Sequence, residues 1–457
     1  MDSADGTSTS PGRKLGWAIA IGFLLALPLF FVWMLVYDRQ TQSQAASASI
    51  TEGWGDRQII SGPLLVIPYR AQATETVVEN GQTVTRSRDV IRELTVAPTA
   101  SVLDTKIRPE RRKRSIYEAV VYDARATGRA SFVLPADLAQ AGVEAAALDY
   151  ARAELRFGIS DPRGLGANPQ VIVAGKALAL QPGQGSTGGK GFFSWIDASK
   201  LGSGPLDVDY SFNLRGNGSI ALTPAAGQTD WTATSTWQNP SFTGDFLPSE
   251  RRVDESGFSA HYRIGNLALG KSLIHTGLPG ESRPDSKAEE NLDEVAARGS
   301  GGPEIGLIQP VNLYSHVDRS AKYGFLFIGF TFLALLMFDV IGGATVSAVE
   351  YLLTGAALIL FFVLLLALAE IIGFTPAYIL AAAAITGLNT AYAAAFLNSW
   401  RRASFVGALL AGLYAVLYIL ISLEAFALII GSTLLFVALA AVMYATRHID
   451  WGARSRA

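Results

Sequence analysis

Residues 323–338 read YGFLFIGFTFLALLMF, and they open an apolar region that continues to residue 446. A helix of about 20 apolar residues is long enough to cross the ~30 Å hydrocarbon core of a bilayer. Five such runs follow one another, at residues 323–345, 351–372, 376–397, 404–423 and 425–446. Because helices that are apolar on every side are buried in a large core or in lipid, this region predicts a bundle of five transmembrane helices.

A sixth apolar run lies near the start of the chain, at residues 15–37, and it follows Arg13 and Lys14. A basic flank before an apolar run occurs in both signal peptides and membrane anchors. The run is longer than the 7–15 apolar residues of a signal peptide, although Ala-Ser-Ala at 46–48 resembles a cleavage site. We interpret residues 15–37 as an uncleaved transmembrane helix and residues 1–14 as a polar tail.

Arginine and lysine near the span ends predict the orientation, because short cytoplasmic loops of membrane proteins are enriched in both. Six spans place both chain ends on one side. That side carries Arg13, Lys14, Arg401, Arg402, Arg447, Arg454 and Arg456, whereas the short turns on the other side carry neither residue type. Three further cations, Arg39, Arg319 and Lys322, flank a long segment where the rule is weak. We expect residues 1–14 and 447–457 in the cytoplasm and residues 38–322 in the periplasm of a bacterium.

Residues 38–322 differ from the rest, because their apolar residues alternate with polar ones. Residues 57–69 predict a strand, a turn and a second strand, and further short strands are predicted at 115–132, 169–181, 206–214, 219–222 and 230–237, with one helix at 136–155. Asn217-Gly218 favours a tight hairpin, and the charged, then glycine-rich residues 281–302 favour a solvated linker. The fold class is an α+β membrane protein with one N-terminal transmembrane helix, a large β-rich, sandwich-like periplasmic domain and a C-terminal five-helix bundle.

Composition excludes several function classes. Charged residues make up 17% of the chain, against about 25% in an average soluble domain, and a net charge of −2 argues against a nucleic-acid partner. The chain has no cysteine, and its four histidines show no metal-binding spacing. No Gly-x-Ser-x-Gly motif occurs. We therefore expect no catalytic residue, no metal and no cofactor.

Acidic residues beside the spans are the candidate functional residues of the membrane region, because an ionisable group in a bilayer usually faces a bundle interior or an interface. Asp339 follows the core of the span 323–345, and Glu370 lies near the end of the next span, 351–372. Glu424 lies in the turn between the last two spans. These acids either cap solvated helix ends or take part in coupled transport. A proton relay needs several acids at matching depths, and only Glu370 and Glu424 share a predicted surface.

Small residues are concentrated in the span 376–397 and recur in 404–423. Because small residues let helix backbones approach closely, we expect these two spans at the centre of the bundle. The phenylalanine-rich spans 323–345 and 351–372 are then expected to face lipid.

Two polar motifs of the segment 38–322 have simple interpretations. Residues 183–191, GQGSTGGKG, lack the serine or threonine and the first glycine of a phosphate-binding loop, so they predict a flexible hairpin loop. Residues 111–114, RRKR, are the strongest basic cluster. Such a cluster is able to contact anionic lipids or polymers of the envelope, but we favour a solvated loop.

Several short motifs are distributed over the chain: GWG at 53–55, ISGP at 60–63 with IPY at 67–69, ISDPRG at 159–164, AKY at 321–323 with LFI at 326–328, YAVLYILISLE at 414–424, and MYATR at 443–447 with DW at 450–451. Together they resemble the CreD family of bacterial inner-membrane proteins. The likeness covers most of the chain. It departs from the family pattern at Asp339, where glutamate is expected, and in a longer, more charged linker.

The resemblance implies an inner-membrane protein of cell-envelope integrity, linked to envelope-stress responses, and it supplies no catalytic residue. The leading hypothesis is a non-enzymatic protein whose bundle, embedded in the lipid bilayer, anchors residues 38–322 for binding an envelope component or partner protein. The second is a transporter or exporter of a lipid-like or small substrate, which predicts a polar mid-membrane cavity with Asp339 or Glu370 facing it. The third and weakest is a periplasmic hydrolase.

Overall fold

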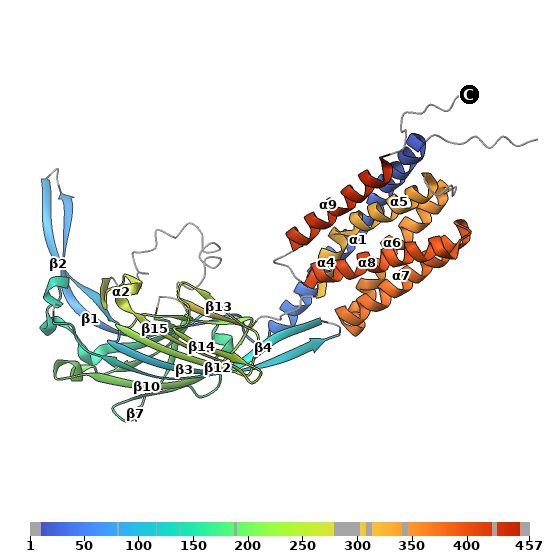
Figure 1. Ribbon diagram of the computed structural model, residues 1–457. Coiled ribbons are helices and arrows are strands. Elements are labelled where there is room, and N and C mark those ends of the chain that lie inside the picture. The colour runs from blue at the N-terminus through green and yellow to red at the C-terminus, as the bar shows by residue number, and fades with distance from the viewer. Residues whose placement is uncertain are drawn as a thin grey trace, which may run out of the picture. The chain divides into compact units, whose positions relative to one another are not determined.

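The computed structural model describes residues 11–79, 82–115, 117–136, 138–186, 190–277, 302–307, 313–340, 346–422 and 427–447. The chain divides into two compact units (Figure 1). Met1–Ala45 and Val311–Ala457 make up the first, which we call the helical unit, and Ala46–Pro310 make up the second, the β unit. The prediction of an α+β chain with a large β-rich region is confirmed.

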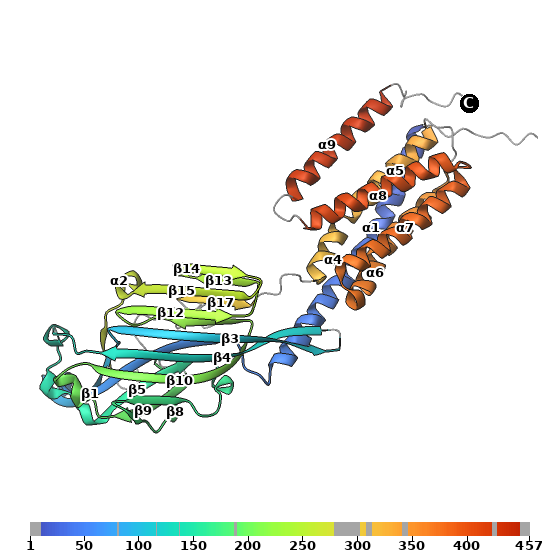
Figure 2. The same cartoon turned by 60° about the horizontal axis from the view of Figure 1, so that its bottom comes forward.

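The described strands of the β unit form two sheets. Figure 2 shows strands β14, β15, β12, β3, β4 and β10 of one sheet running across the view, in this order from top to bottom. This eight-stranded sheet has the order β14 (Glu250–Asp254), β15 (Gly257–Gly265), β12 (Gln228–Ser235), β3 (Ala100–Arg114), β4 (Tyr117–Phe132), β10 (Leu206–Asn217), β6 (Gln170–Val173), β7 (Lys176–Ala177). β12 pairs with β3 in parallel, and β3, β4 and β10 form an antiparallel series.

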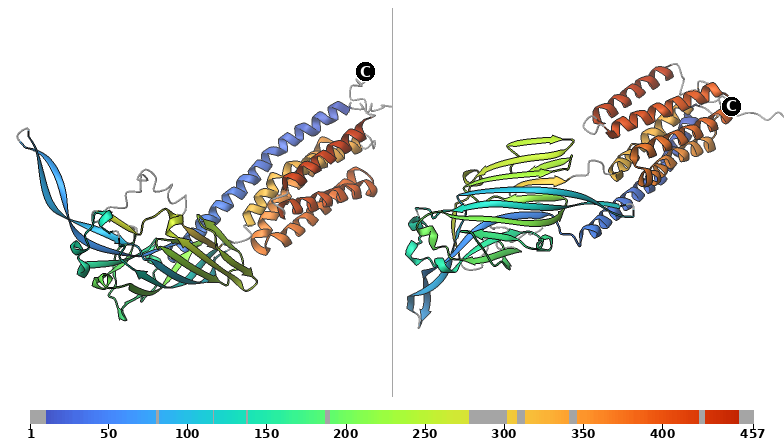
Figure 3. Two further views of the ribbon diagram at one scale, coloured as in Figure 1. Left: turned by 60° about the vertical axis from the view of Figure 1, so that its left-hand side comes forward. Right: turned by 90° about the horizontal axis from the view of Figure 1, so that it is seen from below.

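The nine-stranded sheet has the order β13 (Pro240–Gly244), β17 (Pro303–Leu307), β11 (Ser219–Thr223), β1 (Gln58–Glu79), β5 (Ala153–Ile159), β9 (Lys190–Ile196), β8 (Gln181–Gln184). Its remaining strands are β2 (Gln82–Val96), which pairs with β1, and β16 (Ile274–Gly277), which pairs with β2. The β1–β2 hairpin extends away from the sheets in both views of Figure 3. A short helix, α2 (Asn266–Leu269), follows β15.

Alternating side chains along the strands build a core between the two sheets. In β3, Leu103 is 2% exposed, whereas Asp104 and Lys106 point outward. The hydroxyl of Tyr122, in β4, donates a hydrogen bond of 2.8 Å to the carbonyl of Ser219, which begins β11 in the other sheet. Burial raises the pKa of Tyr122 well above its ordinary value, so its hydroxyl remains a donor. One shared core therefore holds both sheets together.

Two predictions for this region are wrong. The stretch 136–155 is not a helix, because its described residues form three short 3₁₀ turns, Leu138–Ala141, Ala145–Ala147 and Tyr150–Arg152, and then enter β5. Gly142, at φ +72°, follows the first turn in a conformation that ends a helix. Asn217-Gly218 does not close a hairpin either: it carries the chain from β10 to β11, which lies in the other sheet.

Other predicted segments have clear outcomes. The strands at 115–132, 206–214, 219–222 and 230–237 correspond to β4, β10, β11 and β12. The turn predicted within 57–69 is wrong, because these residues belong to one strand, β1, in which Gly62, at φ +85°, lies at a register shift between Ser61 and Leu64. The single strand expected at 169–181 is instead the hairpin β6–β7, whose turn holds Ala174 and Gly175 at positive φ. The hairpin expected at 183–191 is present as β8–β9. Residues 281–301 of the expected linker lie outside the described residues, whereas 303–307 form β17.

The helical unit contains α1 (Pro11–Thr51, as far as Ala45), α4 (Leu313–Lys322), α5 (Gly324–Val340), α6 (Ala348–Ile372), α7 (Phe374–Phe396), α8 (Trp400–Ser422) and α9 (Ala427–Thr446). Among the described residues, five helices are long and apolar enough to cross a membrane: Lys14–Thr51, Leu313–Asp339, Ala348–Ile372, Phe374–Phe396 and Trp400–Ser422. α9 is a further 20-residue helix without a charged residue.

The helices differ from the expected spans in two ways. α1 continues to Thr51 rather than ending at residue 37, and residues 313–322 form α4 of the helical unit rather than part of the segment 38–322. The expected placement within the bundle is wrong for α6 and α7, whereas 44% of the most apolar window of α8 is buried, which agrees with the central position expected for it. Half of the most apolar window of α6 is buried, against 22% for the small-residue helix α7. The aromatic side chains of α6, such as Phe361 and Phe362, fill the interior instead.

Candidate functional site

Asp339 is a buried carboxylate in the helical unit, and it pairs with a cation that comes from the other end of the chain. It is 4% exposed, and its Oδ1 lies 2.6 Å from the Nζ of Lys14. The backbone N–H of Val346 donates to the same oxygen at 3.4 Å. Asp339 Oδ2 is buried and has no hydrogen-bond partner among the described residues.

The position of this pair explains why it forms. Lys14 lies in the first turns of α1, and Asp339 lies at the C-terminal end of α5. The ammonium also donates to the backbone carbonyl of Asp339 at 3.4 Å, because the last carbonyls of a helix lack helical partners and attract cations. The pair thereby links α1 to α5.

The other two predicted acids have separate surroundings. Glu370, near the end of α6, accepts a hydrogen bond of 3.2 Å from the hydroxyl of Tyr314 on α4. Glu424 lies outside the described residues. The structure therefore does not bring Asp339 and Glu370 to a common site, and each joins two helices.

Two grooves on the helical unit are lined by residues other than these acids. One, of about 610 Å³, lies between α7 and α8 and contains the side chains of Tyr378, Tyr414 and Tyr418. The second, of about 450 Å³, lies between α1 and α5 and is lined by apolar residues and glycine. Neither lining includes Asp339 or Glu370.

In the β unit, the motif at 159–164 forms a brace centred on Asp161. Its two carboxylate oxygens accept from the backbone N–H of Asp56 at 3.0 Å and of Arg163 at 3.1 Å. The guanidinium of Arg163 also donates to both oxygens. These hydrogen bonds, led by those from Arg163, lower the pKa of Asp161 to about 2. Asp161 is therefore held ionised as a structural acceptor.

The same brace reaches β1 and β10. The side-chain amide of Gln58 donates to the carbonyls of Asp161, at 3.2 Å, and Arg215, at 2.9 Å. Gly164 allows this close approach, because a Cβ there would lie 2.2 Å from the Arg215 carbonyl oxygen. The motifs that resemble the CreD family thus meet in a buried structural junction.

The basic cluster at 111–114 is part of strand β3 rather than a loop, whereas the predicted exposure is confirmed for Arg111, Lys113 and Arg114. The guanidinium of Arg112 stacks 3.8 Å from the ring centroid of Trp54, and that of Arg215 lies 4.8 Å from the same ring. The indole N–H of Trp54 donates to the carbonyl of Tyr122 at 3.2 Å. Arg114 donates to Ser49 at 2.7 Å. The cluster is consequently engaged within the β unit.

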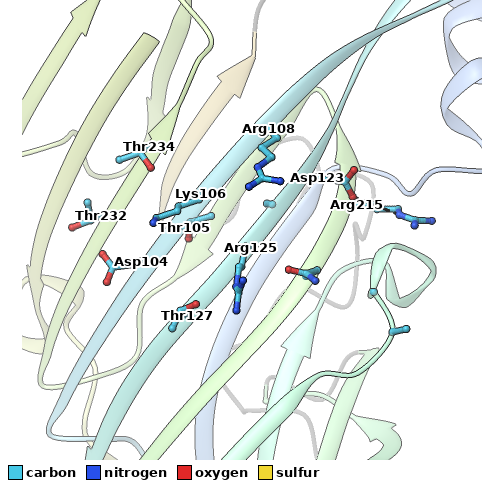
Figure 4. A pocket seen from close by; sticks show the side chains of 14 residues that line it. Asp104, Thr105, Lys106, Arg108, Asp123, Arg125, Thr127, Arg215, Thr232 and Thr234 are labelled. Atoms are coloured by element: carbon cyan, nitrogen blue, oxygen red, sulfur yellow. Dashed lines mark ion pairs between the residues drawn. The ribbon is translucent and has the colours of Figure 1, made fainter. Parts of the chain in front are cut away.

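A polar groove of about 1020 Å³ lies on the outward face of the eight-stranded sheet, across β12, β3, β4 and β10 (Figure 4). We call it the sheet groove. Its lining carries four cations, two carboxylates, four threonines and one asparagine: Lys106, Arg108, Arg125, Arg215, Asp104, Asp123, Thr105, Thr127, Thr232, Thr234 and Asn213. The formal excess is two positive charges.

Strand register brings like charges together in the sheet groove. Lys106 of β3 lies directly opposite Arg125 of β4, and Arg108 follows on the same face. Figure 4 shows the labelled threonines on the Lys106 side of the groove and Asp123 on the other side of Arg108, which it faces directly in the strand register. Among the described residues none of the three forms an ion pair, whereas Asp123 lies 3.6 Å from Arg215. Like charges directly opposite destabilise a sheet, so this arrangement favours a ligand that brings negative charge.

Two comparisons with known proteins bear on the identity of the chain. Residues 10–452 match the family model described as "Inner membrane protein CreD". The chain belongs to the CreD family. The Inner membrane protein CreD of Escherichia coli (strain K12) is 31% identical over 438 residues, which cover 94% of this chain and 92% of that protein. The match spans both units, so this is an inner-membrane protein whose apolar helices contact the lipid bilayer.

Sequence reasoning missed Lys14 and the sheet groove. A signal for the first was present, because Lys14 and Asp339 lie at span ends on the same predicted side. For the second, Asp104, Lys106 and Arg108 alternate along one strand, but their neighbours come from distant segments. Within the part of the chain that the structure describes, no cluster of histidine, aspartate and glutamate is placed to hold a metal ion.

Proposed function

We propose that this CreD-family protein is a non-enzymatic component of the cell envelope. In this proposal six membrane spans anchor the chain in the inner membrane with both ends in the cytoplasm. The β unit lies in the periplasm and binds an envelope component or a partner protein. The observation that carries the proposal is the sheet groove, a wide polar surface that four neighbouring strands form.

The chemistry of the sheet groove favours binding over catalysis. Its lining contains no histidine and no cysteine. Among the described residues, the hydroxyls of Thr127, Thr232 and Thr234 form no hydrogen bond, and the buried hydroxyl of Thr105 accepts one of 2.9 Å from the indole N–H of Trp231. A nucleophilic hydroxyl needs a base within hydrogen-bond reach, and the groove threonines have none there. Cations and hydroxyls without such a base are suited to holding a polar ligand.

Anchoring gives the binding role a physical advantage. A domain tethered to the membrane meets ligands of the envelope at a raised effective concentration. A modest affinity in the groove is then sufficient for occupancy. The inner-membrane location of this proposal agrees with the family to which the chain belongs.

The test uses cells that lack the chain and cells that carry the full chain with a photo-crosslinking residue at Thr127 or Thr234. The readouts are leakage of a periplasmic enzyme and the mass of crosslinked species. We expect leakage without the chain, restoration by the full chain, and crosslinks from both groove positions. Position Lys200, exposed on the β unit outside the groove lining, is the matched control and should give none. An unaltered barrier in cells without the chain would contradict the proposed role.

A transporter is the second candidate, and it is favoured by the buried Oδ2 of Asp339, which has no hydrogen-bond partner among the residues that the structure describes. Asp339 is otherwise paired with Lys14. The charge-swapped double variant Lys14→Asp/Asp339→Lys separates the two roles, because it keeps the pair and removes the carboxylate from α5. Restored barrier function in the swapped variant supports a structural pair. Normal membrane insertion with complete loss of function supports transport.

A further inference from the structure

We infer that the sheet groove binds an anionic saccharide, one that carries carboxylate or phosphate groups on a hydroxyl-rich chain. The inference rests on the proposed function and specifies the ligand class of the same surface. Three observations carry it: unpaired cations at adjacent positions, hydroxyl and carboxylate groups around them, and the size and shape of the groove.

The cations define where the anionic group sits. Lys106, Arg108 and Arg125 point outward from two paired strands, and none has an ion-pair partner among the described residues. Directly opposed strand residues have Cβ atoms about 4.5–5.5 Å apart, so both charged ends reach one ligand group. The planar guanidinium of arginine matches carboxylate and phosphate oxygens through paired hydrogen bonds. A bound anion would relieve the repulsion between Lys106 and Arg125.

The flanking residues match sugar hydroxyls rather than an apolar chain. Thr234 and Asp104 adjoin the cations on the β12 and β3 side, and Thr127 and Asn213 adjoin them on the β4 and β10 side. Carboxylate, hydroxyl and amide groups both accept from and donate to hydroxyls. The nonpolar members of the lining are Ala124, Gly166 and Ala167, and it contains no leucine, isoleucine, valine or phenylalanine. The lining also has no aromatic ring on which a nucleobase would stack.

The dimensions favour a chain of several sugars. Small-molecule sites usually enclose about 300–1,000 Å³, and the sheet groove reaches about 1020 Å³ over four strands. Lys106, Arg108 and Arg125 lie in the middle of the groove, with Thr127, Thr232 and Thr234 toward one end and Asp123 and Arg215 toward the other (Figure 4). An oligosaccharide with charged groups along its length fits this distribution.

The experiment titrates the full chain in a neutral detergent with tetragalacturonic acid, by isothermal calorimetry at two salt concentrations. Uncharged maltotetraose and inorganic phosphate are the comparison ligands. We expect binding of the tetragalacturonate that weakens with salt, no binding of maltotetraose and weaker binding of phosphate. The double variant Lys106→Gln/Arg125→Gln should weaken tetragalacturonate binding at least tenfold.

The matched control is Arg129→Gln, which removes a cation from the same outward face of β4 but outside the groove lining. Arg129 is already paired with Asp209, at 2.6 Å. It should change the affinity less than twofold. An equal loss in Arg129→Gln, equal binding of maltotetraose, equal binding of phosphate, or no binding of tetragalacturonate would each overturn the inference.

A stability measurement excludes misfolding as the cause of lost binding. Lys106→Gln/Arg125→Gln should melt at the same or a higher temperature than the parent chain, because it removes a like-charge contact. A lower melting temperature would contradict the claim that these cations are unpaired. The envelope role can stand if this titration fails, since barrier leakage is measured independently, and the titration can succeed if the leakage test fails.

Discussion

The buried ion pair of the helical unit and the sheet groove of the β unit use charged residues in opposite ways. In the helical unit, Asp339 is buried and Lys14 partly buried, and the two pair across α1 and α5 at 2.6 Å. In the sheet groove, Lys106 and Arg125 face each other outward without an ion-pair partner among the described residues. A charge in an apolar bundle is costly unless it is paired, whereas an outward charge on a sheet is solvated. The comparison teaches that paired charges assemble the bundle and unpaired ones are available for a ligand.

The largest effect is expected from breaking the bundle pair. Asp339→Asn or Lys14→Ala should destabilise the helical unit by about 3 kcal/mol, the lower end of the range for breaking a buried pair, because the Lys14 side chain is 24% exposed. The yield of folded protein in detergent and its resistance to proteolysis measure this. The charge swap Lys14→Asp/Asp339→Lys should recover most of the loss, since each new charge also suits the dipole of its own helix.

Full stability in both single variants would show that the pair contributes nothing to assembly. That result would contradict the claim that paired charges stabilise the helical unit.

The next effect is expected at the junction of the family motifs. Gly164→Ala should destabilise the β unit by about 2–3 kcal/mol, because the added Cβ would meet the carbonyl oxygen of Arg215 at 2.2 Å and overpacked sites cost this much. Hydrogen exchange of β-unit peptides measures the change. Gly202→Ala, where the same probe meets nothing within 4 Å, is the control and should leave exchange unaltered.

A smaller effect, with a defined pH window, is expected at Asp161. Asp161→Asn should cost about 1–2 kcal/mol, since a buried acceptor loses charged hydrogen bonds. The pKa of Asp161 falls from 3.8 to about 2 in the folded chain, so its stabilisation is complete above pH 4 and lost as the pH falls to 2. Brief pepsin digestion across pH 4 to 2 should show a steeper loss for the parent chain than for Asp161→Asn. Equal slopes would contradict the role assigned to this carboxylate.

The smallest effect has the opposite sign. Lys106→Gln alone should stabilise the β unit by about 0.2–1 kcal/mol, the range of cross-strand pair energies, while it weakens tetragalacturonate binding. Such a trade of stability for function is typical of binding sites. Thermal melting with and without ligand measures both quantities. Destabilisation without ligand would show that Lys106 has a structural partner.

Apolar runs in the sequence were sufficient to predict the long helices, because a helix that spans a bilayer is recognised by its length and its apolar composition alone. The continuation of α1 to Thr51 was not predictable in this way, since its last turns are polar. Side-chain size also misled: the alanines of α7 suggested a central helix, yet Phe361 and Phe362 of α6 are the buried residues. The face that a uniformly apolar helix buries depends on its neighbours, and its own sequence does not contain that information.

Alternation predicted the strands, but it did not predict their pairing. β12 lies in parallel beside β3, so that Thr234 meets Lys106 from a distant part of the chain. The sheet groove depends on this pairing, and no local motif marks it. The false helix at 136–155 arose because alanine-rich spacing fits both a helix and short turns. The cations of the groove were visible in the sequence, but their opposition was not.

The central claim is that membrane helices hold the β unit on the periplasmic side. The chain has no cysteine, so single cysteines report position directly. Lys200→Cys and a cysteine added after Ala457 would be treated with a membrane-impermeant maleimide in spheroplasts, before and after permeabilisation. We predict that position 200 reacts in intact spheroplasts and that the added C-terminal cysteine reacts only after permeabilisation. Protection of position 200 until permeabilisation would contradict the account.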